Sequence, residues 1–147
     1  MAEWKRIEDQ AGIDALMGRV AGFHDSCVVS ARFTTGKYVD EKGAMYLSFK
    51  PETYVLLLEI HSQWSKKSLE MLFTGVYKVN LAGYSEKGDG IIFDAHLAYH
   101  EDVPGAEGKK LIVWADWADF VPGETDIDDS TTYIYAESLS WREKEAQ

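Results

Sequence analysis

The sequence is poor in cysteine. Its 147 residues include one, Cys27, so the chain cannot form an intramolecular disulfide or supply the paired cysteines of thiol-based zinc sites. Disulfide-stabilised secreted domains are therefore excluded, and a reducing compartment is expected. Because 46% of the residues are hydrophobic, we expect the chain to fold without a metal, a disulfide or any other cofactor.

Long apolar runs are absent as well. No run approaches the roughly 18 residues that predict a membrane-spanning helix. Residues 1–10 contain acids and no apolar segment, so they do not resemble a signal or transit peptide. The sequence therefore predicts a cytoplasmic protein that does not span a membrane.

Basic residues are too few to balance the acids. Fifteen lysines and arginines stand against 25 acids, and the formal net charge is −10. This charge repels phosphate backbones and anionic lipids, so nucleic acid and membrane surfaces are disfavoured as partners. The same field favours encounter with a basic protein.

The N-terminal region predicts a helical segment over about residues 3–22 of a single domain that spans residues 1–147. Its apolar residues Ile13, Leu16, Met17 and Val20 have the i, i+3, i+4, i+7 spacing of one helical face. The chain contains no fixed-period repeat and no proline-rich linker, which disfavours solenoid and tethered-domain architectures.

Residues 27–141 predict a β region. Short segments of alternating or apolar residues are separated by turn-like clusters of glycine and charged residues. We expect about seven strands, at residues 27–34, 45–50, 54–61, 69–81, 91–100, 111–120 and 131–141. Since the connections are too short for crossover helices, the fold class is α+β, with an antiparallel, largely meandering sheet and an N-terminal helical segment.

The first predicted strand bears on the chemistry of Cys27. Strict alternation places Cys27, Val29, Ala31 and Phe33 on one buried face. A structural cysteine is therefore favoured over a nucleophile activated by His24.

Sequence signatures of catalysis are also missing. The chain has no G-x-G-x-x-G, P-loop, G-x-S-x-G or H-E-x-x-H motif. No catalytic residue is therefore assigned, and the chain is predicted to lack enzymatic activity.

One set of polar residues keeps an alternative open. His24 and Asp25 are adjacent, Asp94 and His96 lie on one strand face, and His61 lies on an earlier strand. If these strands are neighbours, they form a His and carboxylate patch for a metal-assisted hydrolase. His96 and His100 are predicted to lie about 13 Å apart along a strand, too far to share an ion.

Aromatic and acidic residues near the C-terminus suggest a surface for a protein partner, although a two-layer core would use the same aromatic residues. Trp114 and Trp117 point to opposite faces of their predicted strand, so at least one indole is expected at the surface. A neighbouring acidic loop would surround it with negative charge. The predicted contact residues are Trp114, Trp117, Glu124, Asp126, Asp128 and Asp129.

Several segments together resemble a known group of proteins. They are Phe23-His24-Asp25-Ser26 at a strand entrance, residues 69–76, and the closing residues 136–141. The pattern resembles small bacterial α+β proteins that include immunity-protein-like families of polymorphic toxin systems. The resemblance implies a non-enzymatic protein that binds and neutralises a toxin, and a basic toxin would suit the acidity of this chain. Association with a second copy of the chain is left open.

Overall fold

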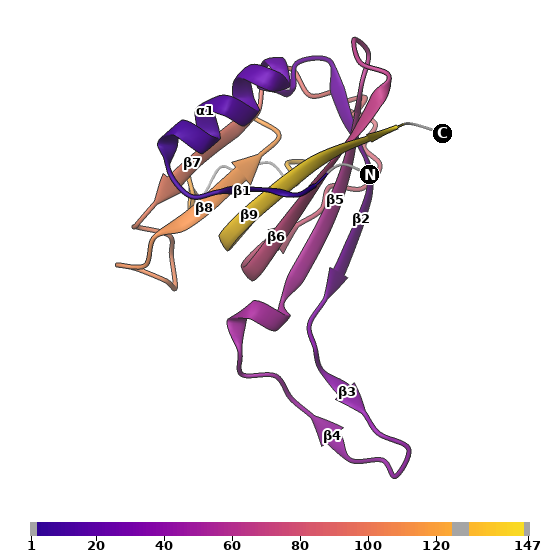
Figure 1. The fold of residues 1–147 in the computed structure, drawn as a ribbon, viewed down its shortest axis with the longest axis vertical. Coiled ribbons are helices and arrows are strands. Elements are labelled where there is room, and N and C mark those ends of the chain that lie inside the picture. Colours follow the sequence, from indigo (N-terminus) through magenta and orange to yellow (C-terminus); the bar gives the residue numbers. More distant parts are fainter. Residues whose placement is uncertain (1–2, 125–129, 146–147) are drawn as a thin grey trace.

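The computed structural model describes residues 3–124 and 130–145 (Figure 1). One α-helix packs against a seven-stranded sheet, and two further short strands form a separate hairpin. In chain order the elements are β1 (Lys5–Ile7), α1 (Gln10–Arg19), the 3₁₀ turn η1 (Ala21–Phe23), β2 (Ser26–Thr34), β3 (Tyr38–Val39), β4 (Met45–Tyr46), the 3₁₀ turn η2 (Pro51–Thr53), β5 (Val55–Ser62), β6 (Lys67–Asn80), β7 (His96–His100), β8 (Leu111–Ala115) and β9 (Tyr133–Glu145).

The sheet consists of two antiparallel meanders joined in the middle. Its strand order is β2-β5-β6-β9-β8-β7, and β1 pairs with the C-terminal half of β9. The expected α+β class with a mostly antiparallel sheet is thus confirmed. The order departs from a simple meander because β6, the longest strand, pairs with β9 and not with β7.

The predicted helical segment at residues 3–22 is too long. Its first part is β1, in which Lys5 pairs with Trp141 and Ile7 with Leu139. The helix begins only after Asp9, whose carboxylate accepts a hydrogen bond from the Gly12 amide at 3.0 Å and so caps the first turn.

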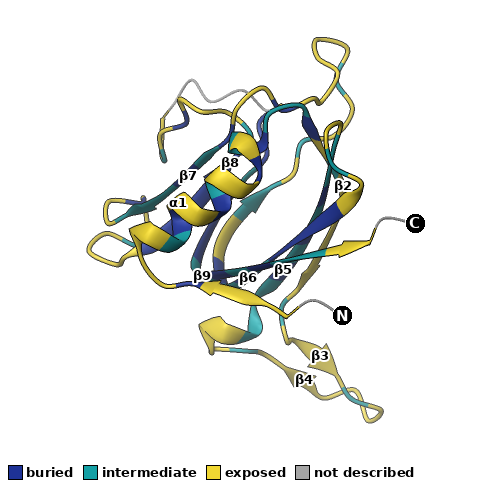
Figure 2. Cartoon of the chain, turned by 45° about the horizontal axis from the view of Figure 1, so that its top comes forward, coloured by how far each residue is buried: buried dark blue, intermediate teal, exposed yellow. Residues whose placement is uncertain are grey.

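The helix contributes one face of the main hydrophobic core. Ile13 and Leu16 are buried, as the spacing predicted, and α1 lies across one face of the sheet (Figure 2). The Phe23 ring meets the fully buried Trp114 edge-on, with ring centroids 5.6 Å apart. This core therefore links the helix, the turn η1 and the middle of the sheet.

A second, smaller core lies on the opposite face of β8. It contains Val103, Leu111, Val113, Ala115, Phe120 and Tyr135. All five residues of β8 are buried, because the strand lies between β7 and β9 and is covered on both faces. Two predicted strands are shorter than expected: residues 91–100 contain only β7, and residues 111–120 only β8.

The strand β2 contains a register shift that the alternation did not predict. Val28 pairs with Ile60 and Ser30 with Glu59, so Val29 is the extra residue of a β-bulge. Residues before and after the bulge therefore exchange faces. The prediction of a buried face with Cys27, Val29, Ala31 and Phe33 is wrong, because all four residues are exposed, and Cys27 lies opposite His61.

Residues 35–50, which we call the arm, project from the sheet (Figure 1). The sequence predicted a longer strand at 45–50, but β4 covers only two residues. Within the arm, Tyr38 pairs with Tyr46 and Val39 with Met45, and the two tyrosine rings stack at 4.7 Å. The arm is exposed along most of its length (Figure 2).

None of the helices in residues 3–124 and 130–145 has the length and apolar character that a membrane span requires.

Gly75 in β6 provides a test of this packing. Its φ is +68°, and an added Cβ would lie 2.5 Å from Glu137 Oε1 and 2.8 Å from Glu137 Cβ. We expect Gly75→Ala to lower the free energy of unfolding by at least about 2 kcal/mol, because backbone strain and overlap add together. Urea denaturation followed by circular dichroism measures this loss.

Gly83→Ala is the matched control. Gly83 has no atom within 4 Å of an added Cβ, and its φ is not in the left-handed region. Its free energy of unfolding should change by less than about 0.5 kcal/mol. Equal losses in the two variants would contradict the close approach of Gly75 to β9.

Candidate functional site

The predicted partner-binding tryptophans lie in different environments. Trp114 is fully buried, so its assignment to a contact surface is wrong. Its position on β8 places it under Phe23, and alternation alone could not show that both faces of this strand are covered. Trp117 follows the end of β8 and is 47% exposed, as expected for one of the two indoles.

Trp117 lies at a hollow with a volume of about 460 Å³. Residues 82–91 form one wall of this hollow, and Val28, Asp116 and Thr132 line its other side. The Thr132 amide donates to Asp116 Oδ2 at 3.2 Å. Burial nevertheless raises the pKa of the Asp116 carboxyl, so the hollow contains a partly desolvated carboxylate beside an exposed indole.

The predicted acidic contact loop can be followed in part. Glu124 is exposed. Asp126, Asp128 and Asp129 lie outside the described residues.

His24 and Asp25 meet at the connector between α1 and β2. His24 Nδ1 donates to the Phe93 carbonyl oxygen at 2.6 Å, and His24 Nε2 lies 3.4 Å from Asp25 Oδ2. The hydrogen bond to Phe93, then the negative charges of Asp25 and Asp94, raise the pKa of His24. Three of the five residues of the alternative polar site therefore interact.

The connector that holds His24 is conformationally strained. Ala21, Phe23 and Asp25 have φ values of 51°, 65° and 57°, a region that residues with a Cβ seldom occupy. Strain of this kind persists only where surrounding contacts hold it in place. Here Trp64 Nε1 donates to the His24 carbonyl at 3.2 Å.

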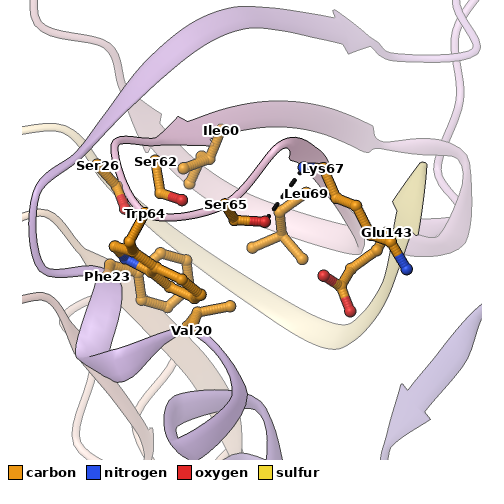
Figure 3. Close-up of a pocket in the computed structure, with 10 residues that line it drawn as sticks. All are labelled: Val20, Phe23, Ser26, Ile60, Ser62, Trp64, Ser65, Lys67, Leu69 and Glu143. Carbon is orange, nitrogen blue, oxygen red and sulfur yellow. Dashed lines mark hydrogen bonds between the residues drawn. The ribbon is translucent and has the colours of Figure 1, made fainter. Parts of the chain in front are cut away.

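Trp64 also closes a small cavity under the connector. Figure 3 shows its indole over Phe23 and Val20, with Glu143 on the far side. The cavity volume is about 20 Å³, room for about one water molecule. It is therefore a packing gap and not a ligand site.

His61 belongs to a separate polar network on the sheet face that points away from α1. Its Nε2 lies 3.3 Å from Glu59 Oε2, and the buried Ser68 hydroxyl donates to the same oxygen at 2.5 Å. The hydrogen bond from Ser68 is the largest effect that holds the pKa of Glu59 below its ordinary value. Glu59 is therefore a stable carboxylate at neutral pH.

This network continues across β6 and β9. Glu70 is buried, and its Oε1 accepts from Arg142 Nε at 2.8 Å. Lys144 Nζ lies 3.6 Å from Glu59 Oε2 and 3.5 Å from Glu70 Oε2, so it bridges the two carboxylates. The charges are balanced within the sheet face, as buried carboxylates require.

His96 is not part of the alternative polar site. The strands β6, β9 and β8 separate β5, with His61, from β7, with His96. His96 instead meets His100, and their Nε2 atoms are 2.9 Å apart. The prediction that these two rings are too distant to share an ion is wrong, because the Cα spacing leaves out the reach of side chains that lean toward each other along the strand.

Within residues 3–124 and 130–145, no group of three or more His, Cys, Asp and Glu side chains is arranged to hold a metal ion. The five predicted residues thus separate into the group at His24, the network at His61 and the pair at His96.

The arm was not predicted as a functional surface, although its sequence contains a signal. In residues 45–50 the apolar Met45, Leu47 and Phe49 alternate with Tyr46, Ser48 and Lys50. Six large hydrophobic side chains of the arm are exposed. They are Tyr38, Val39, Met45, Tyr46, Leu47 and Phe49, of which Phe49 is 88% exposed.

Both roots of the arm are tied to η2. The Thr53 hydroxyl donates to the Thr35 carbonyl at 2.9 Å and also lies 3.0 Å from the Lys50 carbonyl. The Tyr54 hydroxyl donates to the Ser48 carbonyl at 3.1 Å. These bonds join the two ends of the arm to each other and to the start of β5.

The turn at the tip of the arm is also ordered by hydrogen bonds. Asp40 Oδ1 accepts from the Lys42 and Ala44 amides, each at 2.9 Å. The bond from Ala44 is the main cause of a lowered pKa for Asp40. An ionised Asp40 therefore favours the observed turn.

Comparison of the chain with protein-family models, with curated proteins and with solved structures finds no match.

The Ser68–Glu59 bond gives a pH-dependent test. We expect Ser68→Ala to lower the free energy of unfolding at pH 7 by about 1 to 2 kcal/mol, because a buried hydrogen bond to a charged group is lost. The folded state lowers the pKa of Glu59 from 4.5, so this stabilisation is present above about pH 4.5 and disappears as the pH falls through the lower, folded value.

The measurement is urea denaturation of the wild type and Ser68→Ala at several pH values between about 3 and 7. Ser140→Ala is the control, because Ser140 lies on the same sheet face and is part-exposed. Its effect should be small and independent of pH. A loss in Ser68→Ala that stays constant down to pH 3 would show that the bond does not depend on the Glu59 charge.

Proposed function

We propose that this chain is a non-enzymatic protein-binding module and that the arm is its main contact element. The observation that carries the proposal is the set of six exposed hydrophobic side chains on a projecting hairpin. Contiguous exposed apolar surface of this kind is uncommon on proteins that act alone. Tyrosine, methionine and phenylalanine are also the residue types enriched in the cores of protein interfaces.

The arm is prepared for binding by its own hydrogen bonds. Thr53 and Tyr54 hold the roots, and Asp40 holds the tip. Because these bonds restrict the hairpin before a partner arrives, less conformational entropy is lost on association. The exposed Met45 and Phe49 side chains can then enter an apolar groove of the partner.

The distribution of charge indicates a basic partner. Residues 35–50 contain three lysines and two acids, so the arm does not contribute to the net charge of −10. The remaining surface carries all of that negative charge and would face the rim of a partner that receives the arm. A basic rim gives fast, salt-sensitive association.

Neutralisation of a basic toxin, as in immunity-like proteins, is the function that combines these features. Trp117 and Glu124 are exposed and are proposed as a secondary contact for the same partner.

The experiment is capture of partners by the tagged protein from its native host at low and high salt, with identification by mass spectrometry. The variant Met45→Ser/Phe49→Ser removes the two most exposed large side chains of the arm. We expect wild type to retain one basic protein at low salt and the arm variant to lose it, since Phe or Met truncation at an interface core costs on the order of 2 kcal/mol or more.

The control is Val29→Ser/Phe93→Ser. It removes exposed apolar side chains that lie outside both the arm and the hollow beside Trp117. Retention of the partner by the arm variant, or equal loss in both variants, would contradict the role of the arm. Retention at high salt would contradict electrostatic steering, and arm-dependent self-association in sedimentation would replace the basic partner with a second copy of the chain.

A further inference from the structure

Two histidines on β7 converge at one point. His96 and His100 lie on the same face of the strand, their ring centroids are 5.1 Å apart, and their Nε2 atoms are 2.9 Å apart. The chain contains four histidines, so this pair accounts for half of them. The other two, His24 and His61, interact with carboxylates elsewhere.

The surroundings of the pair affect where its protons lie. The Ala118 backbone favours the protonated His96 ring, and His100 Nδ1 lies 3.7 Å from the exposed Asp102 Oδ1, beyond hydrogen-bond distance. A neutral imidazole has one N–H. If neither Nε2 carries that proton, two nitrogen lone pairs converge at 2.9 Å, and a cation bound by both nitrogens, to one side of the line that joins them, removes the repulsion.

We propose that His96 and His100 form a binding site for one divalent transition-metal ion, with water as the remaining ligands. Imidazole nitrogen is a preferred ligand of copper, nickel and zinc ions.

The separation of the two nitrogens indicates which ions fit best. Two atoms 2.9 Å apart, each at a metal–nitrogen distance of about 2.0 to 2.1 Å, subtend an angle of about 90° at the ion. This angle suits the square-planar and tetragonal shells of Cu²⁺ and Ni²⁺ better than the tetrahedral shell of Zn²⁺. The part-exposed rings leave the open side of the shell to solvent.

The backbone under the pair is rigid. His96 pairs with Ala115 and His100 with Leu111, and both of these partners are fully buried. The Phe120 ring lies 6.2 Å from the His96 ring and forms an apolar wall. The pairing fixes the two backbone positions from which the ligands project, which favours a pre-organised site.

A proton shared between the rings is the competing explanation of the short contact. Burial, followed by the nearby His100 ring, lowers the pKa of His96 below its ordinary value. The neutral form is the one that ligates a metal. Direct measurement with metal ions separates the two explanations.

The experiment is calorimetric titration of the tag-free, full-length protein with NiCl₂ near pH 7.5. Two double variants each remove half of the histidines: His96→Asn/His100→Asn and His24→Asn/His61→Asn. We expect one Ni²⁺ per wild-type chain, an affinity at least about tenfold lower in the first variant, and an unchanged affinity in the second. Zn²⁺ should bind more weakly than Ni²⁺ to the wild type.

A second measurement needs no variant. In ¹⁵N-edited spectra of the wild-type imidazoles, added Zn²⁺ should shift the signals of two of the four histidines. Absence of saturable Ni²⁺ binding, equal loss in the two variants, or shifts of all four rings together would overturn the site. Both tests use the isolated protein without a partner. A negative result would therefore contradict the metal site and leave the proposed role of the arm untouched.

Discussion

The pairing of β6 with β9 is the interaction on which the rest of the structure depends. Twelve positions pair along these strands, and every other strand of the sheet attaches to one side or the other of this ladder. On one face the ladder supplies Met71, Phe73 and Leu139 to the core under α1. On the other it brings Glu70 next to Arg142, and through Lys144 it ties Glu59 into the same network. Both the core and the polar face therefore require the same register.

The sequence predicts those features that are set locally. The helical stripe with Ile13 and Leu16 is recovered because periodicity reports which face of a helix is buried. The strand β1 is missed because three residues acquire a strand conformation only through β9, more than 130 positions away. Cys27 is misplaced because β2 lies at the edge of the sheet and is exposed after Ser26, and its bulge breaks the alternation. Trp114 is misplaced because burial on both faces of β8 is a tertiary property. The pair of His96 and His100 depends on side-chain direction, which residue spacing does not contain.

The candidate functional regions differ in how the chain stabilises polar and apolar groups. The polar face satisfies its carboxylates with its own lysine, arginine and serine, so it has little left to offer a ligand. The arm has the opposite character, since hydrogen bonds fix its backbone while its large side chains remain in water. On physical grounds the unsatisfied surface is the one that gains most from a partner. Sequence composition alone cannot separate these cases, because both regions mix apolar and charged residues.

The pairing of the first strand with the last has a consequence for biosynthesis. Lys5, Arg6 and Ile7 find their partners only at Leu139, Ser140 and Trp141, and β6 likewise waits for β9. On the ribosome, β2 and β5 can meet early, but the centre of the sheet stays open until nearly all of this sequence has emerged. Such long-range pairing also slows folding, because loop closure precedes the contacts that compensate for it. During that interval the apolar inner faces of β5 and β6 stay uncovered.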